Sequence, residues 1–557
     1  MDSAEPVKPA ERPARAAFVG AVVAALFTLP GLGSGTLWDN SETNYGEVAR
    51  EILLTHDWAV MHFNLAPFFI QPPLYFWLGA LCAMLWGATS FAMRFPSALA
   101  TIALGAAMGY AAARQAGTRV GIYASMILSS SLMQAVIGRL AIMDALLDLF
   151  VAITIFCWFR ALQTGRESYF VCGWLAAGVG FLAKGPVAPA VALLVVVPYF
   201  FWNRRHERTF APTARAWLYG ALAFAAVALP WPAILIARYG WTPLHQLIGV
   251  YTIGRYTGVI ENQSGPVWYY LPVIVLGFFP WIAFFPMAVA YAVRTLRTES
   301  DGDGPLIRLA LVWCVVPFVF FSLAGTKLPN YVALELPALA ILTARYFDSV
   351  VRKGGTLSAA VSAAFVPLTI GLLAVAIVVF ANENRLGSEG SLALSALTAP
   401  GIAIFVGSLA TAILVARPEA VRIAPYALAI ATLLAFDGIT TIVLPRGEAF
   451  KPIPRLASII ERDRRPGDAV AIQDMSGGNA LIFYTRPVVD VLAKTGEHDT
   501  RTGIVDPRVE ICKSSRVWVV APRDRPPDDP PYGRHRTVVA TDAKAALYLY
   551  DGPLCKG

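Results

Sequence analysis

Long uninterrupted apolar runs constrain this chain more than any other feature of its sequence. Hydrophobic residues make up 57% of the 557 residues and charged residues only 15%, whereas soluble domains carry about 25% charged residues. The apolar residues gather into runs of about 18 to 25, which are long enough to cross a hydrocarbon core of about 30 Å as helices. The runs therefore predict an all-α polytopic membrane protein.

About thirteen crossings are predicted, the first of them a retained signal anchor because no small-residue cleavage site follows it. The predicted spans are 16–35, 96–113, 119–137, 143–162, 169–183, 186–202, 216–237, 268–291, 307–323, 329–346, 357–380, 397–416 and 421–443. One further apolar run, residues 72–87, is not counted among them. We interpret it as a juxtamembrane or re-entrant helix.

Basic clusters between the runs give the orientation. If residues 72–87 crossed the membrane, later clusters such as Arg114/Arg119 and Arg160/Arg166 would face outward, against the positive-inside rule. If they do not cross, every later cluster lies in the cytoplasm. An even number of crossings remains an alternative. The net charge of +8 is thus explained by basic residues in cytoplasmic loops and does not indicate a nucleic-acid partner.

This topology divides the chain into a cytoplasmic tail at 1–15, a transmembrane part at 16–445 and a soluble part at 446–557. The transmembrane part includes an outer loop at 37–94 with juxtamembrane helices. The soluble part is polar, with Pro and Gly between short apolar stretches, which predicts a small α/β domain in the periplasm. There Cys512 and Cys555 could pair or could remain free thiols.

The outer loop opens with an amphipathic helix in the stretch ETNYGEVAREILLTHDW. Asn40 or Ser41 is expected to cap this helix, which places Asp39 and Glu42 at the positive end of its dipole. Acidic residues at a helix start often only stabilise the helix. Glu42 and Asp39 are nevertheless candidate catalytic residues because they lie on the outer face.

A third candidate catalytic acid, Asp144, begins a span beside Arg139. An acid at the rim of a bundle can act as a base or bind a sugar hydroxyl, although a helix cap or an ion pair would also explain it. Further candidates for substrate contacts are Ser41, Tyr45, Gln71 and Arg139.

Three cations are also predicted on the outer face, where the positive-inside rule disfavours them: Lys184, Arg255 and Lys327. A lipid-linked phosphate explains them, since transfer from it leaves negative charge that positioned cations stabilise. Snorkelling to lipid headgroups is the simpler explanation for each residue alone. No metal-ligand spacing is apparent, so no metal cofactor is predicted.

The same motifs resemble the bacterial lipid A aminoarabinose transferases and protein O-mannosyltransferase-like enzymes of the GT-C class. The resemblance rests on ETNYGEVAREILLTHDW, RFPSAL, GPVWYYLPVIVLGFFPWIAFFP and FFSLAGTKLPNY. It implies a GT-C-like catalytic domain in the bacterial inner membrane, a polyprenyl-phosphate sugar donor, no nucleotide, and inversion at the anomeric carbon. It also implies that Lys184, Arg255 and Lys327 lie near the donor phosphate, and that Asp144 and Glu42 line the sugar and acceptor side.

Two departures from the family pattern affect the predicted chemistry. Ser41 stands where the pattern has an aspartate, and Ile70-Gln71 stands where it has Glu-Lys. The second change favours a neutral or uronic sugar over an amino sugar. The acceptor is a lipid, a glycan or a protein, and the competing hypotheses are a flippase for a lipid-linked sugar and an inactive family member.

Overall fold

The structure, a computed structural model, folds into two compact units. It describes residues 12–38, 41–260, 262–298, 304–353, 369, 383–448, 451–473, 480–485, 489–492, 514–525, 535–542 and 544–551. The first unit comprises Met1–Gly31, Ser97–Arg139 and Met143–Val443, and the second comprises Leu32–Pro96, Leu140–Ile142 and Leu444–Gly557. The boundaries predicted at 15 and 445 from topology remain predictions.

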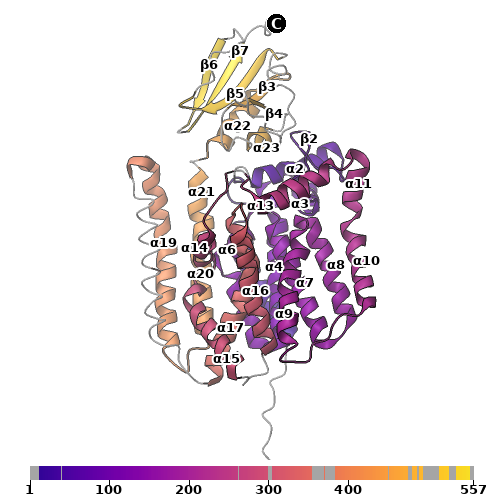
Figure 1. The fold of residues 1–557 in the computed structure, drawn as a ribbon. Helices are drawn as coiled ribbons and strands as arrows, with labels where there is room; N and C mark the ends of the chain where they lie inside the picture. Colours follow the sequence, from indigo (N-terminus) through magenta and orange to yellow (C-terminus); the bar gives the residue numbers. More distant parts are fainter. Residues whose placement is uncertain are drawn as a thin grey trace, which may run out of the picture. The chain divides into compact units, whose positions relative to one another are not determined.

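The described part of the first unit is helical (Figure 1). Its first helices are α1 (Pro13–Thr28), α4 (Ser90–Ala116, which starts in the second unit), α5 (Thr118–Ser129), α6 (Leu132–Ile137), α7 (Asp144–Thr164), α8 (Glu167–Lys184), α9 (Val187–Asn203), α10 (Ala214–Ala228) and α11 (Pro230–Tyr239). Then come α12 (Thr242–Leu244), the π-helix η1 (His245–Gly254), α13 (Arg255–Thr257), η2 (Val267–Tyr269), α14 (Tyr270–Gly277), η3 (Trp281–Phe284) and α15 (Phe285–Thr298). The last are α16 (Gly304–Leu323), η4 (Pro329–Glu335), α17 (Leu336–Lys353), α19 (Glu383–Val415), α20 (Ala424–Gly438) and η5 (Ile439–Val443).

Several of these helices are long and apolar enough to cross a membrane. Within the described residues there are four such helices, or up to six if each of two bent helix pairs counts as one span. The chain is therefore a helical membrane protein, but the predicted number of thirteen crossings is not confirmed. The predicted span at 357–380 lies, apart from residue 369, outside the described residues.

Several predicted spans are broken. The predicted span at 119–137 is divided into α5 and α6 at Ser130 and Ser131, whose hydroxyls donate to the carbonyls of Met126 and Ile127 at 2.6 and 2.7 Å. Pro230 begins α11 after a 50° bend from α10. The predicted span at 268–291 is bent by 107°.

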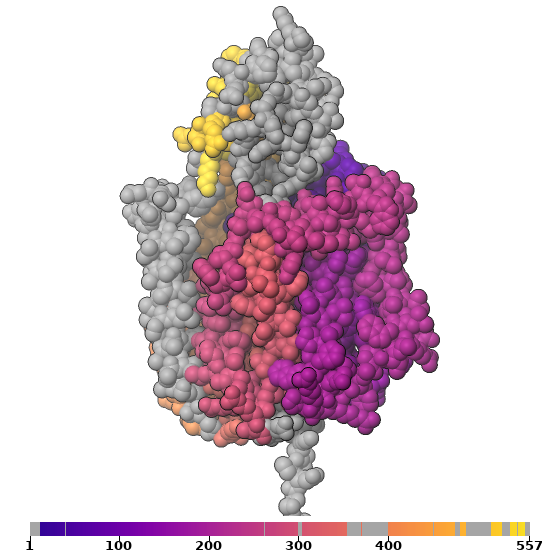
Figure 2. Space-filling view, in the orientation of Figure 1, coloured from indigo at the N-terminus to yellow at the C-terminus, as the bar shows by residue number. Residues whose placement is uncertain are grey.

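Glycines set the close packing of α1, α4 and α5. A Cβ atom added to Gly20, Gly109 or Gly121 would collide with the backbone of a neighbouring helix. Small residues at such positions let membrane helices approach closely, where packing replaces the hydrophobic effect. In the space-filling view α16 lies at the visible face of the unit (Figure 2).

The second unit contains the predicted outer-loop helices. They are α2 (Glu42–Thr55) and α3 (Leu74–Trp86), which pack against each other and flank a short hairpin of β1 (His62–Phe63) and β2 (Ala66–Pro67). The apolar run at 72–87 thus forms a helix of 13 residues. This is about 20 Å at 1.5 Å per residue, short of the hydrocarbon thickness.

The remainder of the second unit has the predicted α/β character. Its elements are α21 (Leu444–Gly447), α22 (Pro452–Asp463), β3 (Ala469–Gln473), α23 (Ala480–Thr485), β4 (Val489–Leu492), β5 (Arg516–Pro522), β6 (His535–Thr541) and β7 (Ala545–Asp551). The strand order is β4-β3-β5-β7-β6, with β3 parallel to β4 and β5 and the other pairs antiparallel. Five consecutive residues of β5 are buried, so both of its faces are covered. That this domain is periplasmic remains a prediction.

Candidate active site

A buried ion pair joins the ends of two helices in the first unit. Asp144 is the first residue of α7 and Lys184 is the last residue of α8. The Lys184 Nζ donates to Asp144 Oδ1 at 2.5 Å, and the side chains are only 16% and 7% exposed. Asn330 Nδ2 donates to the same oxygen at 2.6 Å. The predicted acid and one predicted cation are therefore in direct contact.

The stretch TKLPNY also contacts this ion pair. Asn330 and Tyr331 belong to η4, and Lys184 Nζ lies 5.6 Å from the centre of the Tyr331 ring, within cation–π range. Lys184 thus has an anion on one side and an aromatic face on another. This arrangement fixes an ammonium group in a largely dry environment, where its charge acts strongly on a bound anion.

A second acid lies one helical turn further along α7. Asp148 is 2% exposed and interacts electrostatically with both Asp144 and Lys184. Its Oδ2 atom is buried and makes no hydrogen bond within the described part of the chain. The carboxyl groups of Asp144 and Asp148 therefore both interact with the positive charge of Lys184.

The predicted cation Lys327 is held by backbone carbonyls. Its Nζ donates to the carbonyl oxygens of Ser322 and Ala324 at 2.8 and 2.7 Å and lies 5.8 Å from the centre of the Tyr270 ring. Burial lowers the pKa of Lys327 from its ordinary value, because the charged form loses hydration.

Arg255 and Lys327 lie on two segments that are joined by backbone hydrogen bonds. Thr326 N donates to Arg255 O at 2.9 Å, and Lys327 N donates to Gln263 O at 2.9 Å. The guanidinium carbon of Arg255 lies 5.7 Å from the centre of the Tyr251 ring in η1. The fold therefore brings the segments of two predicted phosphate-binding residues together, although they are far apart in sequence.

Glu42, the predicted catalytic acid of the outer loop, is a fully paired residue of the second unit. Oε1 accepts from Arg94 Nε at 2.9 Å and from Ala141 N at 2.6 Å, and Oε2 accepts from Arg94 Nη2 and Trp38 N, each at 2.8 Å. Glu42 is 0% exposed. Its four acceptor positions are therefore all used.

The other predicted site residues are dispersed. Ser41 occupies the predicted N-cap position of α2, but its exposed side chain makes no capping hydrogen bond. Tyr45 packs on the rings of Tyr75 and Phe76, and Gln71 is half-buried before α3. Arg139 donates to the carbonyls of Phe27 and Pro30 in the first unit. Asp39, Asn40, Cys512 and Cys555 lie outside the described residues.

Sequence reasoning missed Arg94, Asp148, Asn330 and Tyr331. A signal existed for each, since Arg94 lies in RFPSAL, Asn330 and Tyr331 follow Lys327 in TKLPNY, and Asp148 is an acid inside an apolar run. Their partners could not be inferred, because Asn330 meets Asp144 across 186 residues and Arg94 meets Glu42 across 52.

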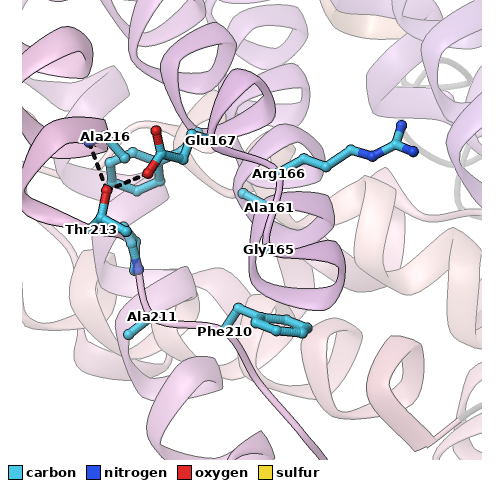
Figure 3. A pocket seen from close by; sticks show the side chains of 10 residues that line it. Ala161, Gly165, Arg166, Glu167, Phe210, Ala211, Thr213 and Ala216 are labelled. Atoms are coloured by element: carbon cyan, nitrogen blue, oxygen red, sulfur yellow. Dashed lines mark hydrogen bonds between the residues drawn. The ribbon is translucent and has the colours of Figure 1, made fainter.

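Figure 3 shows a surface pocket of the first unit, which is lined in part by Glu167 at the start of α8. Its lining includes Arg166, Glu167, Phe210 and Thr213, and the Thr213 hydroxyl donates to the Glu167 carboxylate. Glu167 begins α8 and Lys184 ends it, a separation of about 26 Å along the helix. The pocket is therefore remote from the ion pair. The described residues contain no group of three metal-ligating side chains.

Comparisons with known proteins show which proteins this chain is similar to. A model of the dolichyl-phosphate-mannose-protein mannosyltransferase family matches residues 70–231. The undecaprenyl phosphate-alpha-4-amino-4-deoxy-L-arabinose arabinosyl transferase 2 of Proteus mirabilis is 33% identical over 352 residues, and that of Sodalis glossinidius is 36% identical over 333. The crystal structure of ArnT from Cupriavidus metallidurans bound to undecaprenyl phosphate has a TM-score of 0.77 at 21% identity, covering 96% of this chain and 97% of that one.

The resemblance to these glycosyltransferases is confirmed. The match to the ArnT structure establishes an ArnT-like fold across nearly the whole chain. The sequence match is shorter, since the chain spans 61% of the length of the Proteus mirabilis relative and 58% of the Sodalis glossinidius relative.

Proposed function

We propose that this ArnT-like chain transfers a sugar from a polyprenyl phosphate to an acceptor at the outer face of the bacterial inner membrane. The observation that carries the proposal is the buried Asp144–Lys184 pair, held by Asn330 at the junction of α7, α8 and η4. The names of the relatives from Proteus mirabilis and Sodalis glossinidius state an undecaprenyl-phosphate sugar, and the ArnT structure has undecaprenyl phosphate bound. An anionic donor of this class suits the lysine.

In the proposed reaction Lys184 exchanges Asp144 for a phosphate oxygen of the donor. The acceptor oxygen forms a bond to the anomeric carbon, and the bond from that carbon to the phosphate oxygen breaks, leaving its electron pair on the phosphate. The ammonium stabilises this charge, and Asp144 receives the proton of the acceptor hydroxyl. A single displacement of this kind inverts the anomeric carbon.

Arg255 and Lys327 add positive potential in this proposal. Two backbone carbonyls hold the Lys327 ammonium in one position. Arg255 is joined to the neighbouring segment through its backbone carbonyl, which accepts from Thr326 N. Glu42 takes no proton, because each of its oxygens already accepts two hydrogen bonds. Its part is to hold the start of α2. The acceptor class and the sugar remain proposals, with a neutral or uronic sugar favoured by Ile70 and Gln71.

A transfer assay without nucleotide tests the proposal. Purified protein receives a panel of labelled undecaprenyl-phosphate sugars with lipid acceptors, and products are followed by mass spectrometry. Replacing Lys184 by Gln is expected to lower turnover by about 10²- to 10³-fold, as for loss of one charge-stabilising donor. Replacing the exposed Lys353 at the end of α17 by Gln removes the same charge elsewhere and should leave turnover unchanged.

Two outcomes would contradict the proposal. Equal turnover of the Lys184→Gln and Lys353→Gln proteins would remove the ion pair from the chemistry. Movement of intact donor lipid across vesicles, with no transfer from any member of the panel, would identify a flippase instead.

A further inference from the structure

Three arginines converge on one buried carboxylate in the first unit, away from the candidate active site. Asp348 in α17 is 1% exposed and accepts from Arg119 Nε of α5 at 2.6 Å, from Arg345 Nη1 at 3.0 Å and from Arg352 Nε at 2.7 Å. One carboxylate balances one guanidinium, so positive charge remains in excess.

Neighbouring helix ends increase this excess. Arg15 of α1 and Arg119 both act electrostatically on the Tyr426 hydroxyl of α20, and the Tyr123 hydroxyl of α5 donates to the carbonyl of Arg422 at 2.9 Å. We call Arg15, Arg119, Arg345, Arg352 and Arg422 the basic cluster. Arg119, Arg345 and Arg352 pair with Asp348, and Arg15 and Arg422 lie on α1 and just before α20, two helices that pack on α5. The basic cluster gathers the ends of α1, α5, α17 and α20 with five guanidinium groups and one carboxylate.

The outer members of the basic cluster are accessible to a ligand. The side chains of Arg119 and Arg352 are 42% and 56% exposed, and Arg15 and Arg422 are exposed. Among the described residues Arg119 uses only Nε for a hydrogen bond. Its terminal nitrogens keep the planar fork that binds two oxygens of a phosphate.

An apolar surface adjoins these charges along α1 and α20, which pack on each other through Phe27 and Phe436. Phe18 of α1 is 70% exposed, and Ile423, just before α20, and Ile430 of α20 are 47% and 56% exposed. Exposed guanidinium groups beside exposed apolar side chains match the two parts of a phospholipid, an anionic phosphate and its acyl chains. Basic pockets between membrane helices bind such headgroups.

We propose that the basic cluster binds the headgroup of an anionic phospholipid, with the acyl chains lying along α1 and α20. The bound phosphate bridges Arg119 and Arg422 and offsets the charge that Asp348 leaves unbalanced. The lipid thereby ties together the ends of helices from both halves of the sequence. This site is separate from the donor site, and its occupation does not depend on the proposed reaction.

Native mass spectrometry of the purified full chain tests this inference. The protein is given equal amounts of phosphatidylglycerol and phosphatidylcholine, and retained lipids are counted. The unaltered protein should retain phosphatidylglycerol preferentially. Replacing Arg119 and Arg422 together by Gln should reduce that retention at least fivefold, while Asp348 keeps Arg345 and Arg352 and is not left unpaired.

A matched control replaces Arg204 and Arg205, two exposed arginines after α9, by Gln. Retention should stay within twofold of the unaltered protein. If the Arg119/Arg422 protein does not fold, the single variants Arg352→Gln and Arg205→Gln are compared in the same way. Equal retention of the two lipids by the unaltered protein, or equal losses in test and control variants, would overturn the proposal.

Discussion

Replacing Glu42 by Gln tests whether this acid holds the outer-loop helices in place. The carboxylate accepts two hydrogen bonds from the Arg94 guanidinium and two from backbone N–H groups. An amide of the same shape removes the negative charge and turns an NH₂ group toward N–H donors. The buried arginine, 6% exposed, then keeps an uncompensated charge. Breaking a buried pair in this way costs about 3 to 5 kcal/mol.

This loss should be visible as a lower melting temperature of the detergent-solubilised protein. With an unfolding entropy of about 2.1 cal/mol/K per residue over the whole chain, each kcal/mol corresponds to about 0.9 °C, so the melting temperature should fall by about 3 to 4 °C. The control is Asp463→Asn, in the exposed Arg462–Asp463 pair whose side chains are 71% and 39% exposed, and it should melt with the unaltered protein. A Glu42→Gln protein that melts normally but has lost turnover would refute the structural role and restore Glu42 as a catalytic acid.

Three further predictions concern packing, titration and positioning. Burial and a neighbouring carboxylate on α2 raise the pKa of Glu51 to about 8, so the folded chain binds this proton more tightly. Stability should therefore fall as pH rises from about 4.5 to 8, and Glu51→Gln should flatten the melting temperature over that interval. Gly121→Ala should destabilise the protein by about 1 to 3 kcal/mol through overpacking, whereas Gly447→Ala, with open space around it, should leave the melting temperature unchanged. Asn330→Ala should raise the KM for the donor and lower kcat by about tenfold or more, because Asp144 loses a hydrogen bond to a charged group, of about 1.5 to 3 kcal/mol, and a kinetic profile identical to the unaltered protein would contradict this.

Helix positions were predictable from the sequence where local signals coincide. The helical spacing after residue 41 placed α2 correctly, and the acid at the start of an apolar run placed Asp144 at the first turn of α7. Apolar runs that contain Pro, Gly or Ser are divided into shorter helices more often than the run lengths predict. The break between α5 and α6 lies at Ser130 and Ser131, where a hydropathy profile shows no interruption.

The partners of the charged residues were not predictable from spacing. Nothing near Glu42 in the sequence identifies Arg94 as its guanidinium partner, and nothing near Asp144 identifies Asn330. These contacts depend on how helices distant in sequence are brought together. From the sequence alone, Glu42 and Asp144 are therefore equally plausible catalytic acids. Their surroundings differ, because the Glu42 carboxylate accepts four hydrogen bonds, whereas one oxygen of Asp144 accepts from both Lys184 and Asn330.

The positions of Asp144 and Lys184 at opposite kinds of helix end bear on how the pair can separate. The N-terminus of a helix carries about half a positive charge and the C-terminus about half a negative charge. Asp144 begins α7 and Lys184 ends α8, so each side chain keeps a favourable dipole when its partner withdraws. In the proposed reaction, an incoming phosphate that takes the ammonium therefore leaves the carboxylate partly compensated by the helix dipole, and the backbone itself would lower the barrier to exchanging one anion for another.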